Sequence, residues 1–368
     1  MRSVRRIVAV VGIALGAAAG ALEAGARWLV PVSDEFFRPD AVAGLHHIEG
    51  RAGRWRSAEF DVSVRINSHG FRDRERTYAK RNGTRRVVVL GDSVTEAFQV
   101  SLEETFTARL ERRLSEPGRA VEVLNLGISA LGPAQEYLVY RAYGARYAPD
   151  LVVLVVFMAN DIRGASVELE GKPYLRYPVV AGNGALERDA SGGVRFTEPT
   201  RPGRARQWAR ANSAAYRFVR DRVVPVLGGP ARATATDDLL AIYREPLAPA
   251  WQRAVEVTHA IIVELERAVR ADGGRLMVVV VPAPWEVDPA ARTIAPDVPP
   301  ASVDWRAAER RTVAWLRANG LTTLPMSDAF AADIARGGRP YFAADGHLTP
   351  HGHALMTEHL ADALGRAL

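Results

Sequence analysis

The residues best suited to covalent chemistry in this chain are a serine and a histidine, which stand in two short polar blocks. Ser93 ends the block Gly-Asp-Ser at 91–93, and His347 ends the block Asp-Gly-His at 345–347. A hydroxyl nucleophile needs a base to take its proton, and that base needs a carboxylate to fix its tautomer. The first block offers the hydroxyl, and the late block offers an imidazole with Asp345 beside it.

Two further blocks offer groups that could stabilise negative charge on a substrate oxygen. Asn-Leu-Gly occupies 125–127, and Ala-Asn-Asp occupies 159–161. Backbone N–H groups and side-chain amides are the usual donors to an oxyanion. If each block ends a strand of one parallel sheet, all of them lie at the edge where ligands bind in such folds. The four blocks together predict acyl transfer.

Each of these residues also has a simpler interpretation. Gly-Asp-Ser alone is common as a turn that caps a helix, and Asp92 and Asp161 are expected to bond to their own turns rather than act as acid or base. A metal site built from Asp345, His347, His351 and His353 is the other alternative. No His-Glu-x-x-His motif is present, and histidines two apart on a helix face different directions. We therefore expect no metal ion and no cofactor.

The elements that would position these blocks alternate along the chain as strands and helices. Five short apolar runs predict buried strands, at 86–90, 121–125, 151–157, 276–281 and 321–325. Periodic segments between and after them predict helices, at 102–114 after a Ser101/Glu104 capping box, from Pro133, at 251–269, at 304–318 and from Thr349-Pro350. This order predicts an α/β fold with a mostly parallel sheet covered on both sides.

Three parts of the chain lie outside this rhythm. Residues 1–26 are apolar after a basic start, residues 27–85 have an irregular pattern, and 86–368 form the main domain with an insertion at about 163–250. The insertion is rich in Gly, Pro and Arg, and a stretch of that length is expected to contain some helix, around 206–226. Trp285 follows the fourth predicted strand and would either line the substrate pocket or pack as a loop aromatic.

These blocks, in this order, resemble the SGNH/GDSL hydrolases, over roughly residues 86–162 and 274–364. The resemblance implies a flavodoxin-like three-layer α/β/α sandwich with a five-stranded parallel sheet. It implies a catalytic triad of Ser93, His347 and Asp345. It also implies an oxyanion hole formed by the Ser93 and Gly127 N–H groups and the Asn160 side chain.

The chain departs from the family pattern at two places. Met158 stands where the family has a glycine before its Asn-Asp pair, and we expect it to crowd the space beside the oxyanion and to favour small acyl groups such as acetyl. Only Gly346 separates Asp345 from His347, a spacing that resembles the anchored, polysaccharide-modifying members. His351 and His353 follow closely, but they would fall inside the first turn of the last helix, so His347 is the expected base.

The composition narrows the functional class and the location. The net charge is +6, but the arginines are scattered without a basic run interleaved with aromatics, so no nucleic-acid partner is expected. The absence of cysteine excludes disulfides and thiolate chemistry. Arg2, Arg5 and Arg6 precede an apolar run that Glu23 interrupts, which is typical of an export signal. We expect an uncleaved membrane anchor with the rest of the chain extracytoplasmic; a cleaved signal and a buried core helix are the alternatives.

Three functions remain open on the sequence alone. The first is an extracytoplasmic serine esterase that cleaves small acyl esters on a carbohydrate or another envelope component. The second is an O-acyltransferase of a cell-envelope polysaccharide, because a sugar hydroxyl can intercept the same acyl-enzyme. The third is a non-catalytic binding module on the same fold, which the intact blocks disfavour. The sequence leaves the substrate and the oligomeric state open.

Overall fold

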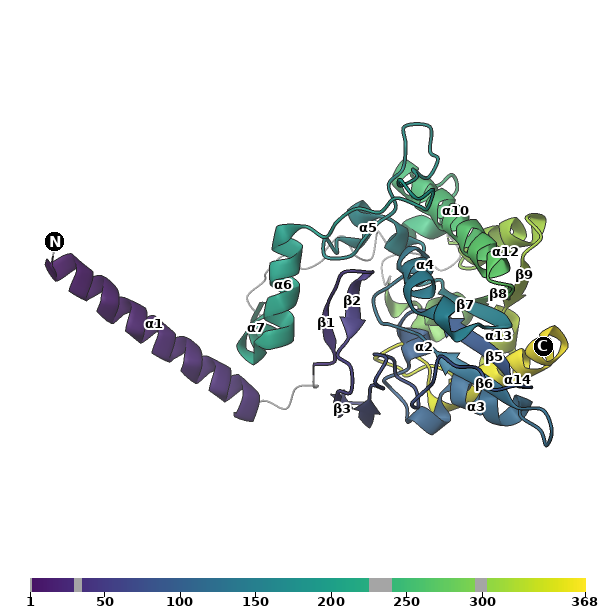
Figure 1. Ribbon diagram of the computed structural model, residues 1–368, viewed down its shortest axis with the longest axis horizontal. Helices are drawn as coiled ribbons and strands as arrows, with labels where there is room; N and C mark the ends of the chain where they lie inside the picture. The colour runs from purple at the N-terminus through teal and green to yellow at the C-terminus, as the bar shows by residue number, and fades with distance from the viewer. Residues whose placement is uncertain (1, 30–34, 225–239, 295–302) are drawn as a thin grey trace.

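The computed structural model describes residues 2–29, 35–224, 240–294 and 303–368 (Figure 1). At its centre is a five-stranded sheet in which every pair of neighbours is parallel, in the order β6-β5-β7-β8-β9. The strands are β5 (Arg85–Leu90), β6 (Val121–Asn125), β7 (Leu151–Phe157), β8 (Arg275–Val281) and β9 (Thr322–Pro325). This is the 2-1-3-4-5 order of flavodoxin-like sheets. The predicted fold class is confirmed, and each strand lies within one residue of its predicted bounds.

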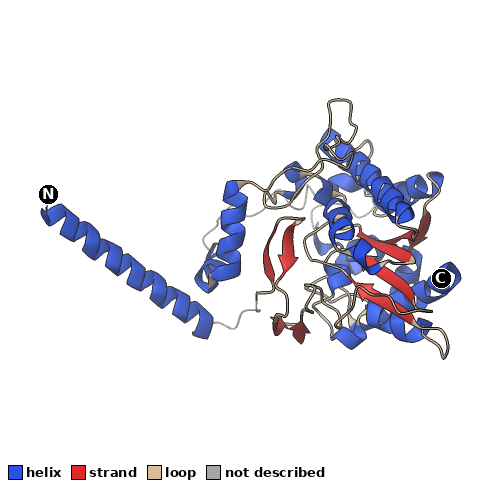
Figure 2. Ribbon diagram, in the orientation of Figure 1, coloured by secondary structure: helices blue, strands red, loops and turns tan. Residues whose placement is uncertain are grey.

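Helices cover both faces of the sheet, which explains why its strands are apolar on both sides (Figure 2). Along β5, Val88 and Leu90 belong to one core cluster, and Val87 and Val89 belong to the other. The first cluster packs against α4 (Pro133–Ala142), α10 (Pro249–Ala271) and α12 (Ala307–Ala318), and the second against α3 (Phe106–Leu114), α13 (Ser327–Ala335) and α14 (Pro350–Ala367). Two hydrophobic cores, one on each face, make the three layers.

The helix predicted at 102–114 is divided in two. A short 3-10 helix, η1 (Leu102–Glu104), follows the predicted capping box, in which the Ser101 hydroxyl donates to Glu104 over 2.7 Å. Thr105 is extended, and its hydroxyl accepts from the Ala108 N–H at the start of α3. The chain therefore contains two consecutive caps, and the second one begins the longer helix.

The segment before the sheet forms two antiparallel hairpins that the irregular sequence pattern did not predict. β1 (Phe37–Asp40) pairs with β2 (Gly44–His47), and β3 (Ala52–Arg56) pairs with β4 (Asp61–Arg65). Phe36, Leu45, Val64 and Phe71 of this region are buried in the first core cluster. The hairpins are thus packed onto the α/β body.

The insertion after β7 contains helices, as its length required. It begins with the short elements η3 (Arg163–Ala165) and α5 (Val167–Glu170). The helix expected around 206–226 appears as α6 (Arg201–Asn212) and α7 (Ala214–Phe218), which continues into a π-helical segment, η4 (Val219–Val223). Residues 225–239 lie outside the described part of the chain. The insertion returns through η5 (Ala241–Tyr243) to α10.

The amino terminus is one long helix, α1 (Arg2–Leu29), that extends away from the body (Figure 1). It contains one window, Val10–Arg27, that is long and apolar enough to cross a membrane by length and composition, with a mean hydropathy of 1.3 and 6% of its residues buried. A helix this apolar and this exposed is unusual for a soluble core element, so the buried-helix alternative does not fit.

Candidate active site

Ser93 lies at the start of the short helix α2 (Ser93–Glu96), directly after β5. A side chain on Gly91 would place its Cβ 2.2 Å from the Thr95 hydroxyl, so only glycine lets the helix fold back so tightly on the strand. Asp92 caps the helix by accepting from the Val94 N–H over 2.9 Å. The local sequence thus holds the Ser93 hydroxyl at the carboxyl end of β5, where the strand order reverses.

The three residues expected to form the triad are brought together in a continuous hydrogen-bonded chain. His347 Nε2 lies 2.8 Å from the Ser93 hydroxyl oxygen, and His347 Nδ1 lies 2.6 Å from an Asp345 carboxylate oxygen. Because a carboxylate can only accept, Nδ1 carries the proton and Nε2 is free to accept from the serine. This is the tautomer that a general base for Ser93 requires.

The surroundings of His347 favour its protonated form. Burial by itself lowers the pKa, but the hydrogen bond and charge of Asp345, together with the charges of Asp92 and Glu96, outweigh it, so the pKa of His347 is raised above 6.5. An imidazole that is readily protonated is well suited to take the serine proton and pass it on.

The two other late histidines have different partners. His351 is on the first turn of α14, and its Nε2 lies 2.8 Å from the Asp333 carboxylate. His353 is buried and accepts from the Phe106 N–H, and burial lowers its pKa to about 3. Neither ring contacts Ser93, so His347 is the only one of the three in position to act as its base.

Asn160 follows β7 at the same edge of the sheet and is half-buried. Its side-chain nitrogen donates to the Asp92 carboxylate over 2.9 Å, and that amide has a second hydrogen available for an oxyanion. The Ser93 N–H has no acceptor among the described residues. Two of the three expected oxyanion donors, the Ser93 N–H and the second Asn160 amide hydrogen, thus have no acceptor among the described residues.

Gly127 does not fit the role that the resemblance implied. Its N–H donates to the Asn125 side chain over 2.9 Å, so the donor is already engaged. A Cβ at this position would lie 2.4 Å from the Glu96 nitrogen, which means that Gly127 is required for close packing under α2. Three residues later, Ala130 adopts a left-handed conformation with φ of 71°, and its N–H has no acceptor in the described part of the chain. Nothing in an alanine signals that conformation in the sequence.

A group of buried carboxyls lies behind the nucleophile. Asp92 and Asp161 each bond to their own turns, as expected, and Asp161 accepts from the Phe157 N–H over 2.7 Å. Glu136 is buried on α4, and neither of its carboxyl oxygens has a partner among the described residues. Burial, and then the charge of Asp92, raises the pKa of Glu136 well above its usual value. The protonated form of Glu136 is therefore favoured.

Met158 and Trp285 follow β7 and β8 at the carboxyl edge of the sheet. The Met158 side chain is buried in the first core cluster. Trp285 is half-buried against the core and donates to the Tyr243 hydroxyl over 2.8 Å, yet it also lines a cleft beside Asp345.

The loop that carries Asp345 is held by a carboxylate from the amino-terminal hairpins. Glu59, in the β3–β4 turn, accepts from the backbone N–H groups of Ala343, Ala344 and Asp345 over 2.8, 3.0 and 2.7 Å. Phe60 packs on Phe342 at the same place, with ring centroids 5.2 Å apart. The sequence offered no signal for this contact, because it joins residues far apart in the chain.

The helix that carries Ser93 is also held by residues of the amino-terminal hairpin segment. His47 Nε2 lies 2.6 Å from Glu96, and its Nδ1 lies 2.9 Å from the Gly70 carbonyl oxygen. His47 thus links α2 to the segment around Gly70 through two buried contacts. Glu96 also accepts from the N–H and hydroxyl of Ser129, which joins α2 to the segment that contains Ala130. The buried guanidinium of Arg72 donates to carbonyls at the end of α2.

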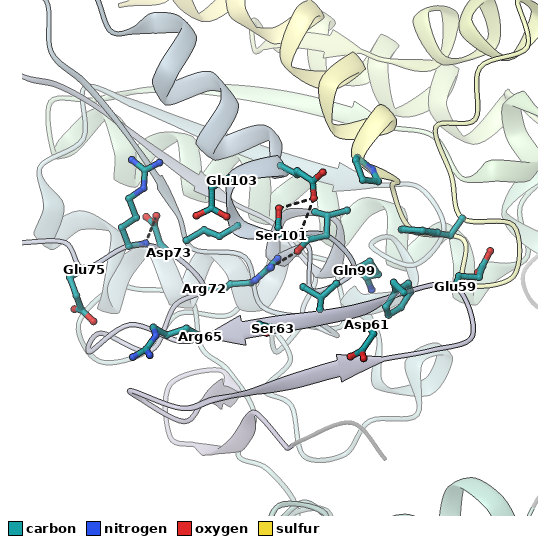
Figure 3. Close-up of a pocket in the computed structure, with 18 residues that line it drawn as sticks. Glu59, Asp61, Ser63, Arg65, Arg72, Asp73, Glu75, Gln99, Ser101 and Glu103 are labelled. Atoms are coloured by element: carbon teal, nitrogen blue, oxygen red, sulfur yellow. Dashed lines mark hydrogen bonds between the residues drawn. The ribbon is translucent and has the colours of Figure 1, made fainter. Parts of the chain in front are cut away.

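Two clefts flank the loop that carries Asp345. One, of about 710 Å³, lies between the β3–β4 hairpin and η1, with Arg72, Glu59 and Phe342 in its wall (Figure 3). The other, of about 530 Å³, is lined by Trp285, Tyr341, Phe342 and Asp345. Aromatic rings mixed with charged groups, rather than a continuous apolar channel, form the walls of both.

The comparisons with known proteins find only remote similarities. No protein-family model matches the chain, and no curated protein sequence matches it. Among solved structures, the chain is similar to esterases and lipases.

Three of these structures illustrate the range. A GDSL-like lipase from Bacteroides thetaiotaomicron is 15% identical, with a TM-score of 0.37 and coverage of 77% of this chain and 89% of the lipase. An acetyl xylan esterase, AlAXEase, is 13% identical, with a TM-score of 0.39 and coverage of 76% and 99%. A variant of an acetyl-xylooligosaccharide esterase from Geobacillus is 11% identical, with a TM-score of 0.40 and coverage of 76% and 94%. At such identities and TM-scores the function has to be argued from the side chains of the chain itself.

Proposed function

We propose that this chain is an extracytoplasmic serine esterase of the SGNH/GDSL type, which removes small acyl groups from a carbohydrate or another envelope component. The observation that carries the proposal is the hydrogen-bonded chain from Ser93 through His347 to Asp345, with distances of 2.8 and 2.6 Å. A solvent-accessible serine aligned with an imidazole in the correct tautomer has few structural uses other than nucleophilic catalysis.

The reaction proceeds through an acyl-enzyme. His347 Nε2 takes the hydroxyl proton as the Ser93 oxygen attacks the ester carbonyl carbon, and Asp345 stabilises the imidazolium that forms. The imidazolium then gives the proton to the departing alcohol, and the carbon–oxygen bond of the ester breaks. A water molecule, deprotonated by the same imidazole, attacks the acyl-enzyme and releases the acid.

The oxyanion is held by the Ser93 N–H, the second amide hydrogen of Asn160 and, in place of Gly127, the Ala130 N–H. Ser129 bonds to Glu96 through both its N–H and its hydroxyl, and this keeps Ala130 close to the helix that begins at Ser93. Each preorganised donor of this kind is typically worth about 100-fold or more in rate.

The preference for small acyl groups on a polar carrier is inferred from the walls of the two clefts beside the Asp345 loop. Trp285 and Phe342 provide flat apolar faces on which a sugar ring can stack, and charged side chains surround them. The substrate is therefore expected to be a glycan ester with an acetyl-sized acyl group.

The location follows from α1. We assign it as an uncleaved anchor, with Arg2, Arg5 and Arg6 on the cytoplasmic side and the catalytic domain outside. The apolar residues Val10, Ile13 and Leu22 of α1 are exposed to between 47 and 73% of their surface, which leaves them available to lipid. Cleavage of α1 as a signal would instead release a soluble esterase.

The test is a panel of p-nitrophenyl esters from acetyl to octanoyl, assayed with and without candidate glycans as acceptors. We expect acetyl esters to turn over fastest and free acetate to be the main product. Faster turnover of octanoyl esters would contradict the small-acyl preference. Acetylated glycan as the main product would identify the chain as an O-acyltransferase, and no turnover of any ester would contradict the proposal as a whole.

A further inference from the structure

Helix α6 presents a cationic and aromatic ridge on the outside of the molecule. It contains four arginines and no acidic residue. Arg201, Arg204 and Trp208 are spaced so that they lie along one face of the helix, and all three are exposed. Trp208 is 63% exposed, which is unusual for a tryptophan in a folded chain.

An adjoining face of α6 is packed against the body. Gly203 and Gln207 are buried, and the Gln207 amide donates to the Arg38 carbonyl oxygen of β1 over 3.4 Å. A Cβ on Gly203 would lie 2.7 Å from the Pro173 carbonyl oxygen, so the helix is seated closely. This packing holds α6 in place and leaves Arg201, Arg204 and Trp208 exposed.

The ridge lies next to the end of α1. Glu23 of α1 accepts from the Ser213 hydroxyl and from the Ala214 and Ala215 N–H groups, over 2.8, 2.9 and 3.0 Å, and thus caps α7. Arg27 donates to the Asn212 carbonyl oxygen at the end of α6. Because Glu23 is occupied by these protein groups, the lipid-embedded part of α1 ends at about Leu22.

Trp208 lies close to the point where α1 meets α6 and α7. It precedes Asn212 by one helical turn, about 6 Å along the axis. Figure 1 shows α1 leaving the molecule from the side that α6 and α7 cover. Tryptophan favours the boundary between headgroups and acyl chains, and arginine binds phosphate oxygens in a bidentate manner. The chemistry of the ridge and its position agree.

We propose that the α6 ridge, formed by Arg201, Arg204 and Trp208, binds anionic phospholipid headgroups of the same bilayer that α1 crosses. This inference rests on the membrane anchor in the proposed function. The contact would add a second attachment point to the anchor and fix the orientation of the catalytic domain above the membrane. The same surface of the catalytic domain would then always face the substrates in the envelope.

The absence of cysteine makes the test direct. In the full-length chain, Trp208→Cys is labelled with a polarity-sensitive fluorophore. The control is Arg113→Cys with the same label, because Arg113 is exposed and belongs to α3, on the far side of the body. Both proteins are reconstituted into vesicles of phosphatidylcholine alone or with phosphatidylglycerol. Flotation with the vesicles and hydrolysis of a soluble acetyl ester establish that each chain is inserted and folded.

We expect the probe at position 208 to shift to the blue and to be quenched by lipids with a headgroup nitroxide, more strongly with phosphatidylglycerol, whereas the probe at position 113 does not respond. Adding Arg201→Gln and Arg204→Gln removes two cations, each worth about fivefold in attraction to an anionic surface, and should weaken the contact about 30-fold. A chain that floats but whose probe at 208 behaves like that at 113 would overturn this inference and leave the anchor intact. A chain that does not float would overturn both.

Discussion

Glu59 is expected to be a positioning residue for catalysis, although it lies outside every motif and touches none of the reacting atoms. Its carboxylate receives three consecutive N–H groups of the loop that carries Asp345. Glu59→Ala removes all three acceptors at once. Ala343 and Ala344 are exposed, so water can replace the carboxylate there, and the free energy of unfolding should fall by only about 1–2 kcal/mol.

The effect on turnover should be larger than the effect on stability. A displacement of about 1 Å in a catalytic group can cost about 100-fold in rate. The loop keeps two other backbone bonds, from Phe342 N–H to the His347 carbonyl and from Gly346 N–H to the Phe342 carbonyl. We therefore expect kcat on p-nitrophenyl acetate to fall by about 10- to 100-fold in Glu59→Ala, with little change in KM. Glu59→Gln keeps one acceptor oxygen, so its kcat should lie between those of the wild type and Glu59→Ala.

The pH profile separates positioning from a general loss of structure. A loosened Asp345 supports the imidazolium less well, so the acid limb of kcat/KM should move to lower pH in Glu59→Ala. Asp61→Ala is the matched control, since Asp61 lies in the same hairpin but pairs with Arg54 and Arg56. A wild-type kcat and an unmoved acid limb in Glu59→Ala, or an equal loss in Asp61→Ala, would refute this reasoning.

Three further predictions concern the base, the oxyanion hole and the backbone. The pKa of His347 is raised above 6.5, so kcat/KM should rise with pH through a midpoint above that value. Asp345→Asn should move this midpoint to lower pH and lower kcat about 10⁴-fold. A midpoint that stays in place in Asp345→Asn would contradict the assignment of His347 as the base. Asn160→Ala should lower kcat by about 100- to 1000-fold yet leave Ser93 reactive towards a phosphonate, as mass spectrometry can show. Gly320→Ala, at φ of 75°, should lower the free energy of unfolding by about 1 kcal/mol in urea titrations, whereas Gly182→Ala, in open space at an ordinary φ, should not.

The sequence predicted the α/β body well because local signals determine it. Runs such as Val87–Leu90 are apolar throughout, since both faces of the sheet are covered, and turn or capping residues mark their ends. The polar blocks at 91–93, 159–161 and 345–347 were recognisable because each follows a strand or precedes a helix. Their approach to one another then follows from the parallel order of the sheet.

The sequence could not predict the contacts that support the site from a distance. The His47–Glu96 contact and the Glu59 bonds to the Asp345 loop join segments that no local pattern connects. The β1–β4 hairpins are short and only partly apolar, so their strands lacked the alternation that predicts a sheet. These contacts nevertheless make residues 36–76 part of the site's support.

Gly127 shows a different limit of sequence analysis, namely that the oxyanion role was assigned to it from a motif alone. The glycine was in the expected block, but its N–H is taken by Asn125, and its lack of a side chain serves the packing of α2. The left-handed residue of this segment is Ala130, and an alanine gives no sequence signal for positive φ.

The most direct test of the central claim is to react the full-length chain with a fluorophosphonate at neutral pH and map the adduct by mass spectrometry. The account predicts a single adduct on Ser93, formed much more slowly in His347→Ala and absent in Ser93→Ala, together with loss of acetyl esterase activity in Ser93→Ala. An adduct on another serine, or full esterase activity in folded Ser93→Ala, would contradict the assignment of Ser93 as the nucleophile.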